Sequence, residues 1–537
     1  MENPKTKIIF VTGGVVSSLG KGVAAGALGA LLQARGFSVH ARKFDLYLNI
    51  DTNSMSPLQH GEIYVTADGF ETDLDLGYYE RFLGIKLSKN DSISGGRIYW
   101  EVLNAERRGD YLGETVQLIP HVSDKIKEYF SAPPGVDFLI CEFGGTVGDI
   151  EGMIFLEAAR QFANDIGRRN AMFIHLTLAP FIGTAGELKT KPTQHSMRIL
   201  LEKGIQADML IVRTPRMFDM AEQKKIGLFC NLAPENVISG IDMDNIYKIP
   251  PAYEAQGAAD RIFEHFGMPA AAGDLLKFKK ISDYLDADKP AVDIAVVGKY
   301  FQVADAYKSL NEALFHAGIP NNVKVNIHNV DTEVLEKAAD AELDEILGGM
   351  SGILVPSGFG ERGAAGKIRA TRFARVRGIP YLGLCLGMQL ATIEFMRNVC
   401  GRPNAGSREF SDTCDPVITA PETGGRPAMR LGAHSCVIKP GTLAHKIYGA
   451  GPISERHRHR YELNIEYRDI LEKHGMVISG FSPDGDLPEI IEIPDHPFFM
   501  GVLFHPEFQS SPYTGHPLFS AFIKAAMTSP LLKGIVG

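Results

Sequence analysis

The sequence GLCLGMQ at residues 383–389 decides the fold of the second half of this 537-residue chain. It interrupts an apolar run at a cysteine, and the preceding IPYL at residues 379–382 is suited to a buried parallel strand. A sharp turn from strand to helix lifts a nucleophile out of the sheet edge and points the first N–H of the helix at the reacting atom. The pattern predicts an α/β domain with Cys385 as its nucleophile.

The expected partners of Cys385 lie in FHPEF at residues 504–508. Pro506 favours extended geometry at His505, and residues two apart in an extended segment face the same way. We therefore expect His505 to act as general base and Glu507 to orient it. A lone cysteine in an apolar run is more often a core residue, and His-Pro-Glu can be a surface turn. The elbow, the His-x-Glu pair and PSGFG at 356–360 together favour catalysis.

These motifs resemble the class I glutamine amidotransferases, in which the cysteine attacks the side-chain amide of glutamine and releases ammonia. The resemblance implies an oxyanion hole formed by the N–H groups of Gly358 and Leu386. It further implies a glutamine site made of Gly358, Leu386, Gly387, Met388, Gln389, Glu409 and Arg460.

Composition and charge narrow the class of protein. The chain is 45% hydrophobic and 22% charged, as soluble globular proteins are, and its length predicts two or three domains. A net charge of −9 argues against a general nucleic-acid binder. The six cysteines lack C-x-x-C spacing, no leader precedes Ile8, and no apolar run reaches membrane-spanning length. We expect a reduced, cytoplasmic protein without nucleic-acid or membrane partners.

Short apolar runs alternate with amphipathic stretches, which predicts α/β domains with parallel sheets. A polar, Lys-rich stretch at 273–290 is typical of a linker, and AVDIAVVG at 291–298 begins a new α/β pattern. We predict a synthetase domain at 1–270, a linker at 271–290 and an amidotransferase domain at 291–537. Other expected strands are Lys7–Thr12, Phe138–Cys141, Ala171–Leu178, Met209–Arg213, Ile353–Pro356, Ile379–Leu384 and Phe499–Phe504.

A second reactive region lies near the N-terminus. The strand-like IIFVTGG at 8–14 leads through VVSSLGKG at 15–22 into an Ala/Leu-rich helix. Backbone N–H groups of such a loop bind phosphate oxygens, and Lys21 would reach the β- and γ-phosphates. The spacing departs from the standard P-loop, and Gly22 replaces the usual Ser or Thr. It resembles the dethiobiotin-synthetase branch of P-loop proteins; a simple turn is the alternative.

Acidic and basic residues extend this phosphate site. Glu142 ends an apolar strand, and ETDLD at 71–75 carries alternating acids, the ligand type that Mg²⁺ on triphosphates takes. Singly, each acid is more often a solvated surface group. GELKTKPTQ at 186–194 offers two cations and two hydroxyls for a second polyanion.

The sequence resembles the CTP synthase family nearly end to end. In the first half the resemblance is carried by the runs VTGGVVSSLGKG, MSPLQHGE, ETDLDLGYYERF, ERRGDYLGETVQ, EFGGTVGDIE, GELKTKPTQHS and NIYKIP, and in the second half by GLCLGMQ, ERHRHRYE and FHPEF. The resemblance implies a ligase that aminates UTP to CTP with ATP, Mg²⁺ and ammonia passed internally from glutamine. It also implies feedback inhibition by CTP, allosteric activation by GTP and a homotetramer.

The same resemblance implies roles for individual residues. ATP would contact Ser18, Leu19, Gly20, Lys21, Gly22, Val23, Lys43 and Asp75, and Mg²⁺ would be held by Asp75 and Glu142. UTP or CTP would contact Ser17, Asp149, Ile150, Glu151, Lys189, Thr190, Lys191, Pro192, Thr193, Gln194 and Lys225. Phe359 and residues 456–460 would lie where GTP acts, and His60 would gate ammonia entry.

The chain departs from the family pattern at four places. Leu46 replaces a proline, Thr52-Asn53 replaces Pro-Gly, and Ser357 replaces a glycine, which costs energy if that position needs a positive φ. The segment 419–427 is short for the family, above the expected GTP site.

Three other assignments can be compared with this family, and a cobyrinic-acid-type synthetase is the main alternative. A cobyrinic-acid-type amidating synthetase shares the build but lacks KTKPTQ. A regulatory or filament-forming protein with a lapsed glutaminase conflicts with the intact Cys385, His505 and Glu507. A GMP-synthetase assignment fails because the SGGxDS loop is absent.

Overall fold

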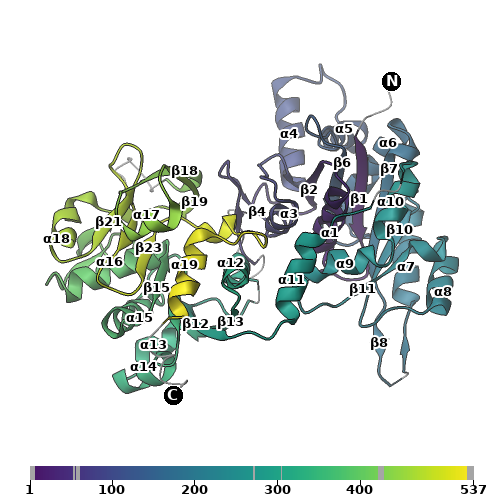
Figure 1. Ribbon diagram of the computed structural model, residues 1–537. Coiled ribbons are helices and arrows are strands. Elements are labelled where there is room, and N and C mark those ends of the chain that lie inside the picture. Colours follow the sequence, from purple (N-terminus) through teal and green to yellow (C-terminus); the bar gives the residue numbers. More distant parts are fainter. Residues whose placement is uncertain are drawn as a thin grey trace. The chain divides into compact units, whose positions relative to one another are not determined.

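The computed structural model describes residues 6–52, 55, 61–184, 186–269, 272–303, 305–420 and 428–528. The chain divides into two compact units, one made of Met1–Ser54 and Thr72–Asp286 and the other of Met55–Glu71 and Ala287–Gly537. Figure 1 colours the chain from purple to yellow along the sequence. The second unit thus takes in a short segment from the N-terminal half.

The first unit is built on a seven-stranded parallel sheet in the order β11-β10-β7-β1-β6-β2-β5. Its central strands are buried on both faces, which explains their continuous apolar runs. The strands are β1 (Lys7–Gly13), β2 (Val39–Asp45), β5 (Ser92–Ser94), β6 (Phe138–Phe143), β7 (Ala171–Leu178), β10 (Met209–Thr214) and β11 (Val237–Ile241), beside a small hairpin of β8 (Phe181–Ile182) and β9 (Glu187–Leu188).

Helices cover this sheet and begin where the strands end. They are α1 (Lys21–Ala34), α3 (Asp75–Leu83), α4 (Gly95–Arg108), α5 (Ser123–Glu128), α6 (Met153–Asp165), α7 (Lys191–Glu202), α8 (Met220–Cys230), α9 (Ile249–Glu254), α10 (Ala258–Phe266) and α11 (Leu276–Asp286). Because every strand of the sheet is parallel, the loops after β1, β2 and β6 meet at one edge, where ligands of α/β folds bind.

Helix α11 corrects the prediction of a polar connection at 273–290. Its residues Phe278 and Ile281 are buried, and the ring of Phe278 lies 6.4 Å from that of Phe82 in α3. The apolar residues of LKFKKISDYLD recur at helical spacing, which the lysines between them obscure. Most of this stretch is therefore a helix packed on the first unit.

The second unit contains a nine-stranded mixed sheet in the order β13-β12-β14-β15-β23-β22-β21-β18-β19. The first five strands are parallel and the rest antiparallel. The bounds are β12 (Ala291–Gly298), β13 (Lys324–Asp331), β14 (Gly352–Val355), β15 (Tyr381–Leu384), β18 (Arg430–Ile438), β19 (Ile453–His459), β21 (Val477–Phe481), β22 (Pro488–Glu492) and β23 (Phe499–Val502), with a separate sheet of β16 (Ala405–Ser407), β17 (Asp415–Thr419) and β20 (Glu462–Leu463).

The helices of the second unit are α12 (Lys308–Asn321), α13 (Thr332–Lys337), α14 (Asp340–Leu347), α15 (Ala364–Arg377), α16 (Leu386–Asn398), α17 (Leu443–Tyr448), α18 (Arg468–Lys473) and α19 (Pro517–Ala526). The strands predicted at 379–384 and 499–504 are shorter than expected, because only 381–384 and 499–502 pair. None of the helices in the described ranges has the length and apolar character needed to cross a bilayer.

The N-terminal segment that joins the second unit carries β3 (Tyr64–Val65) and the start of β4 (Glu71–Thr72). The Tyr64 hydroxyl donates to the carbonyl of Phe508 at 2.9 Å. Arg456 of β19 donates to the Tyr64 hydroxyl at 2.9 Å and to the carbonyl of Val65 at 3.0 Å. This segment is therefore an integral part of the second unit.

Candidate active sites

Cys385 lies at a strained turn between β15 and α16. Its φ of 52° and ψ of −104° lie outside the regions that non-glycine residues normally adopt. Glycines on either side allow the turn, because a Cβ on Gly387 would lie 2.2 Å from the carbonyl oxygen of Val355 and one on Gly383 would lie 2.7 Å from the backbone of Gly387. The predicted nucleophile elbow is present.

His505 and Glu507 form a buried pair beside this elbow. Nδ1 of His505 lies 2.7 Å from Oε1 of Glu507. Burial lowers the pKa of His505, but the Glu507 carboxylate and the Cys385 thiol outweigh it and raise that pKa to about 10. Nε2 of His505 has no other hydrogen-bond partner among the described residues, which leaves it for the thiol. This geometry suits a thiolate–imidazolium pair.

The prediction that an extended backbone brings His505 and Glu507 together was wrong. His505 has φ −113° and ψ 80°, and Pro506–Gln509 is a short 3₁₀ helix rather than an extended segment. The turn of helix, not alternation along a strand, brings the Glu507 carboxylate back to the imidazole. Proline favours the first turn of a helix as well as extended neighbours, so the sequence allowed both geometries.

The residues predicted to bind glutamine differ in burial and in their hydrogen-bond partners. Leu386 opens α16, so its N–H lacks an intrahelical acceptor. Nε2 of Gln389 donates to the carbonyl of Tyr461 at 2.8 Å, and its buried Oε1 has no partner within the described chain. Oε1 of Glu409 accepts from the N–H of Gly360 at 2.7 Å. Gly387 and Met388 are buried in the first turn of α16, whereas Arg460 is exposed.

The loop after β14 accommodates Ser357 without strain, because Ser357 is not among the residues with positive φ. Gly358 follows it, half-buried, and its N–H makes no hydrogen bond within the described residues. The backbone donor that the resemblance implies is therefore free. Of the short segment at 419–427, residues 421–427 lie outside the described residues.

The glycine-rich loop between β1 and α1 has the geometry of a phosphate-binding turn. Val15, Ser18 and Gly20 have positive φ values of 81°, 58° and 84°. Nζ of Lys21 donates to the carbonyl of Gly145 at 2.8 Å, and burial lowers the pKa of Lys21. The exposed Ser17 and Ser18, the buried Leu19 and the half-buried Val23 complete the loop and first turn.

Packing explains why Gly22 replaces the usual hydroxyl residue. A Cβ at this position would lie 2.2 Å from Oδ1 of Asp75, at the start of α3. A side chain at position 22 would displace this carboxylate. The carboxylate of Asp75 therefore occupies the space that a Ser or Thr side chain at position 22 would need.

Lys43, Asp75 and Glu142 meet at the carboxyl edge of the sheet. Lys43 and Glu142 are register partners on β2 and β6, and Nζ of Lys43 lies 2.9 Å from Oε2 of Glu142, in close contact with Asp75 and 3.8 Å from Asp45. Burial raises the pKa of Asp45 to about 6, although Lys43 opposes the shift. The sequence predicted Lys43, Asp75 and Glu142 here but missed Asp45.

The donor set here fits a divalent cation that also takes phosphate oxygens. Oε1 of Glu142 is buried without a partner in the described chain, while Tyr79 donates to Oε2 at 2.6 Å. Carboxylate oxygens are the ligands Mg²⁺ prefers. Among the described residues no three His, Cys, Asp or Glu side chains converge as a complete metal site. Two carboxylates plus substrate phosphates would complete the shell.

The residues predicted to bind a pyrimidine nucleotide fall into two groups. Lys189 pairs closely with Glu187, and Lys225 of α8 is near enough to lower the pKa of Glu187 after Lys189. The side chain of Gln194 bonds that of Thr190, Lys191 is exposed and Pro192 is half-buried at the start of α7. The hydroxyl of Thr193 is buried and lies within hydrogen-bond distance of the Thr177 hydroxyl and the carbonyl of Leu178.

The second group follows β6. Asp149 accepts from the N–H of Thr146 at 2.9 Å and precedes a 3₁₀ turn, Ile150–Gly152. Ile150 is 83% exposed and Glu151 is exposed as well. Both side chains are therefore open to a ligand or another subunit.

A cavity of about 160 Å³ beside the P-loop contains residues that sequence reasoning missed. Its lining includes Leu19, Gly20 and Val23 of the loop and first turn, together with Arg213, Asp242, Met243, Ile246 and Tyr253. Arg213 donates to the carbonyl of Ser18 at 3.1 Å and to Asp242 at 2.7 Å. The only signal was the run NIYKIP at 245–250, which carries no phosphate-binding pattern of its own.

The other residues that differ from the family pattern, Leu46 and Thr52, belong to the segment that follows β2. Leu46 is buried, and its Cδ1 would meet a Cβ placed on Gly145 or Gly152, so it packs against the loop that follows β6. Thr52 is buried and its hydroxyl has no partner in the described chain. Asn53 and the proposed ammonia gate, His60, lie outside the described residues.

Comparison with known proteins finds a family for each half of the chain. Residues 7–268 match the family model described as CTP synthase N-terminus, and residues 302–525 match glutamine amidotransferase class-I. Together with the elbow and the His–Glu pair, the second match defines the chain as a glutamine amidotransferase.

Relatives match nearly the whole chain. The CTP synthase of Paramagnetospirillum magneticum is 54% identical over 97% of this chain and 99% of its own, and that of Azospirillum brasilense is 52% identical over 97% and 99%. The glutaminase domain of Trypanosoma brucei CTPS with bound acivicin is 40% identical, covering 44% of this chain and 94% of that domain with a TM-score of 0.43. The chain belongs to the CTP synthase family.

Proposed function

We propose that this chain catalyses the glutamine-dependent amination of UTP to CTP, with ATP as co-substrate. The observation that carries the proposal is one chain holding both a Cys385–His505–Glu507 array and a P-loop with a buried lysine–carboxylate cluster. Relatives of nearly full length that bear the name CTP synthase favour this reaction over that of a cobyrinic-acid-type synthetase.

Glutamine hydrolysis follows from the geometry of the second unit. The Cys385 thiolate attacks the side-chain amide carbon, and the N–H groups of Gly358 and Leu386 stabilise the resulting oxyanion. The His505 imidazolium, held by Glu507, protonates the leaving nitrogen so that ammonia departs and a thioester remains. His505 then takes a proton from water as the thioester is hydrolysed to glutamate. Gln389, Glu409 and Arg460 hold the amino-acid end, and Gly387 and Met388 shape the pocket floor.

The first unit supplies charge and positioning for phosphoryl transfer. The loop N–H groups of residues 18–23 and the cations Lys21 and Lys43 bind the triphosphate of ATP. Asp75 and Glu142 would hold Mg²⁺, which would neutralise part of the phosphate charge. Phosphorylation of the uracil 4-oxygen makes a leaving group, and ammonia displaces it as phosphate.

The cavity lined by Arg213 and Asp242 is the place for the adenosine part of ATP. Its apolar wall of Met243, Ile246 and Tyr253 suits a purine face, and it shares Gly20 with the phosphate loop. UTP, or CTP as an inhibitor, binds the Lys189–Gln194 segment and Lys225 with its phosphates, and Ser17 and Asp149–Glu151 lie toward its base and ribose. GTP activates from the region of Phe359 and residues 456–460.

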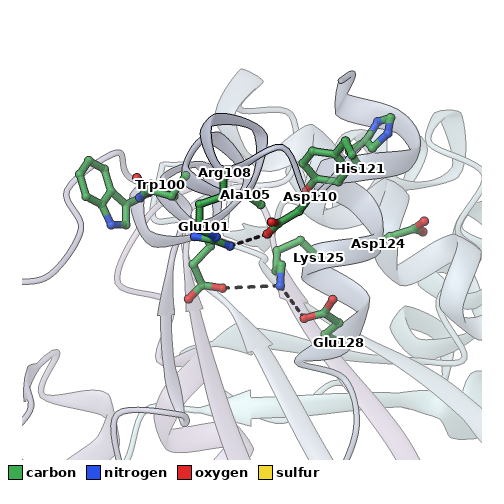
Figure 2. A pocket seen from close by; sticks show the side chains of 11 residues that line it. Trp100, Glu101, Ala105, Arg108, Asp110, His121, Asp124, Lys125 and Glu128 are labelled. Atoms are coloured by element: carbon green, nitrogen blue, oxygen red, sulfur yellow. Dashed lines mark hydrogen bonds and ion pairs between the residues drawn. The ribbon is translucent and has the colours of Figure 1, made fainter. Parts of the chain in front are cut away.

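A homotetramer is supported by apolar side chains that the first unit leaves exposed. Trp100 and Leu103 of α4 are 56% and 60% exposed and Leu112 is 93% exposed. Trp100 also lines a cavity of about 590 Å³, and Figure 2 shows its ring pointing away from the Arg108–Asp110 pair at the cavity wall. Large apolar groups beside ordered ion pairs are typical of subunit contacts.

The decisive test is CTP formation by the purified chain from UTP, ATP and glutamine, followed by nucleotide chromatography. The expected result is CTP in proportion to the glutamate released, with no CTP when UTP or ATP is omitted. Glutamate release without any UTP-dependent product would contradict the synthetase assignment.

A further inference from the structure

The loop that carries Gly358 is held by two buried lysines. Lys367 of α15 is 1% exposed, and its Nζ donates to the carbonyls of Pro356 at 2.8 Å and Ser357 at 3.3 Å. Lys299, after β12, is 7% exposed, and its Nζ donates to the carbonyls of Phe359 at 2.6 Å and Arg362 at 2.9 Å. Four carbonyl oxygens of one loop thus accept from two ammonium groups.

These bonds determine where the loop N–H groups point. The carbonyl of Ser357 and the N–H of Gly358 belong to one planar trans peptide, so they point in opposite directions. When Lys367 holds the carbonyl, the Gly358 N–H is turned away from it and stays free of other partners in the described chain. The next peptide but one is fixed at both ends, because Lys299 holds the Phe359 carbonyl and Glu409 accepts from Gly360.

Both lysines lie against the reaction centre. A Cβ on Gly358 would lie 3.6 Å from Nζ of Lys367, 3.6 Å from Cε of Lys299 and 3.4 Å from Cδ2 of Leu386, the residue that provides the second oxyanion donor. Burial, and next Lys299, lower the pKa of Lys367 to about 7, while Cys385 opposes the shift. A buried amino group that, within the described residues, donates only to carbonyls of this loop is placed to hold the loop in one conformation.

We propose that Lys367, with Lys299, is a positioning residue of the glutaminase that fixes the Ser357–Gly358 peptide so that the Gly358 N–H faces the oxyanion. The inference rests on the proposed glutaminase function and adds the groups that pre-organise its oxyanion hole. Such donors act only when their direction is fixed before the reaction.

The test compares Lys367→Met, which keeps the volume and removes the donor, with Lys439→Met, which removes a surface lysine of the same unit. Three rates are measured: glutamine hydrolysis under saturating nucleotides, alkylation of Cys385 by iodoacetamide, and CTP formation from free ammonia. Alkylation needs the thiolate but no oxyanion hole, and ammonia-dependent synthesis reports that the chain is folded.

We expect Lys367→Met to lower kcat for glutamine about tenfold or more with KM changed less than about threefold, because a mispositioned donor is lost mainly in the transition state. Alkylation and ammonia-dependent synthesis should stay near the parent values, as all three rates should for Lys439→Met. A parent-like kcat, or alkylation that falls in parallel with kcat, would overturn the proposal. A parent chain that hydrolyses no glutamine would instead refute the proposed function.

If Lys367→Met fails to fold, Lys299→Met decides the question. It frees the carbonyls of Phe359 and Arg362 and predicts the same pattern, a lower kcat at parent-like alkylation. Retention of the parent kcat in that variant would count against the inference.

Discussion

Nε of Arg458 lies 2.7 Å from Oε1 of Glu71, two residues before Asp73 in the acidic run of the N-terminal half. The guanidinium of Arg458 also lies 5.1 Å from the ring centroid of Phe359. The backbone carbonyl oxygen of Arg458 lies 3.8 Å from Sγ of Cys385. One ion pair thus ties a residue of the N-terminal half to the wall of the glutaminase site.

We expect Glu71→Gln to weaken glutamine hydrolysis by roughly threefold to tenfold, because a partly buried charge pair that orders neighbouring groups is worth about 1 kcal/mol. Ammonia-dependent synthesis should remain, since Glu71 is not itself placed on nucleotide. The matched control is Glu62→Gln, which loosens the same segment at Ser309 without touching Arg458. Equal losses in both variants would mean that only the anchoring of the segment matters.

Cys385→Ala should abolish glutamine-dependent CTP formation, because the nucleophile is gone. Synthesis from free ammonia should continue and rise with pH as more unprotonated NH₃ becomes available. Both activities are measured on the same preparation. Glutamine use at the parent rate would refute the nucleophile assignment.

Glu507→Gln should move the alkaline limit of glutaminase activity to lower pH, since Glu507 helps to raise the pKa of His505 to about 10. The folded pKa exceeds the ordinary value of 6.5, so the pair stabilises the protein fully below about pH 6.5 and loses this effect as pH rises toward 10. The substitution should therefore destabilise the second unit more at pH 6 than at pH 10 in thermal unfolding. A pH-independent difference would contradict the ion pair.

Lys21→Ala should lower CTP synthesis by roughly 10² or more, with ammonia or glutamine as nitrogen source, because it removes charge stabilisation from the phosphoryl-transfer step. Alkylation of Cys385 by iodoacetamide serves as the control and should not change. Full synthetase activity would remove Lys21 from the ATP site.

Gly22→Ser restores the residue usual in a P-loop, yet we expect it to impair the enzyme. Its Cβ would lie 2.2 Å from Oδ1 of Asp75, so the carboxylate must shift. The apparent affinity for Mg²⁺ should fall, and excess Mg²⁺ should partly restore the rate of CTP formation. Gly36→Ser, at an open position with φ 88° at the far end of α1, is the control for a serine at a glycine of the same unit; a rate loss there that equals the loss at Gly22 would speak against the Asp75 contact.

How far the sequence predicted these sites depends on how local each arrangement is. The elbow at Cys385 and the loop before Lys21 are contiguous and were predicted with their neighbours. The His505–Glu507 contact was predicted for the wrong backbone reason, because Pro506 is compatible with both extended and helical geometry. Arrangements that depend on tertiary structure were not predicted. Arg213 and Asp242 lie in and after strands β10 and β11, and no motif indicates the position of these strands in the sheet. Helix α11 was not predicted because its lysines obscure the apolar spacing.

The Lys299 and Lys367 bonds escaped for the same reason. Lys299 is distant in sequence from the carbonyls that it binds, and Lys367 is separated from its acceptors by a turn. Nothing in the sequence PSGFG predicts that a lysine binds its carbonyl groups. Backbone carbonyl partners leave no trace in residue identity, since every residue has one.

The membership of β3 in the second unit bears on where the gene can be divided. A fragment that begins at Ala291 retains every group of the cysteine site but leaves behind Tyr64 and Val65, which accept from Arg456. Arg456 is 2% exposed, so its guanidinium would lose two acceptors at a buried position, and removing hydrogen-bond partners from a buried charge is strongly destabilising. An independent glutaminase from this chain therefore needs the peptide 61–71 supplied alongside it, much as a split protein needs its complementing strand.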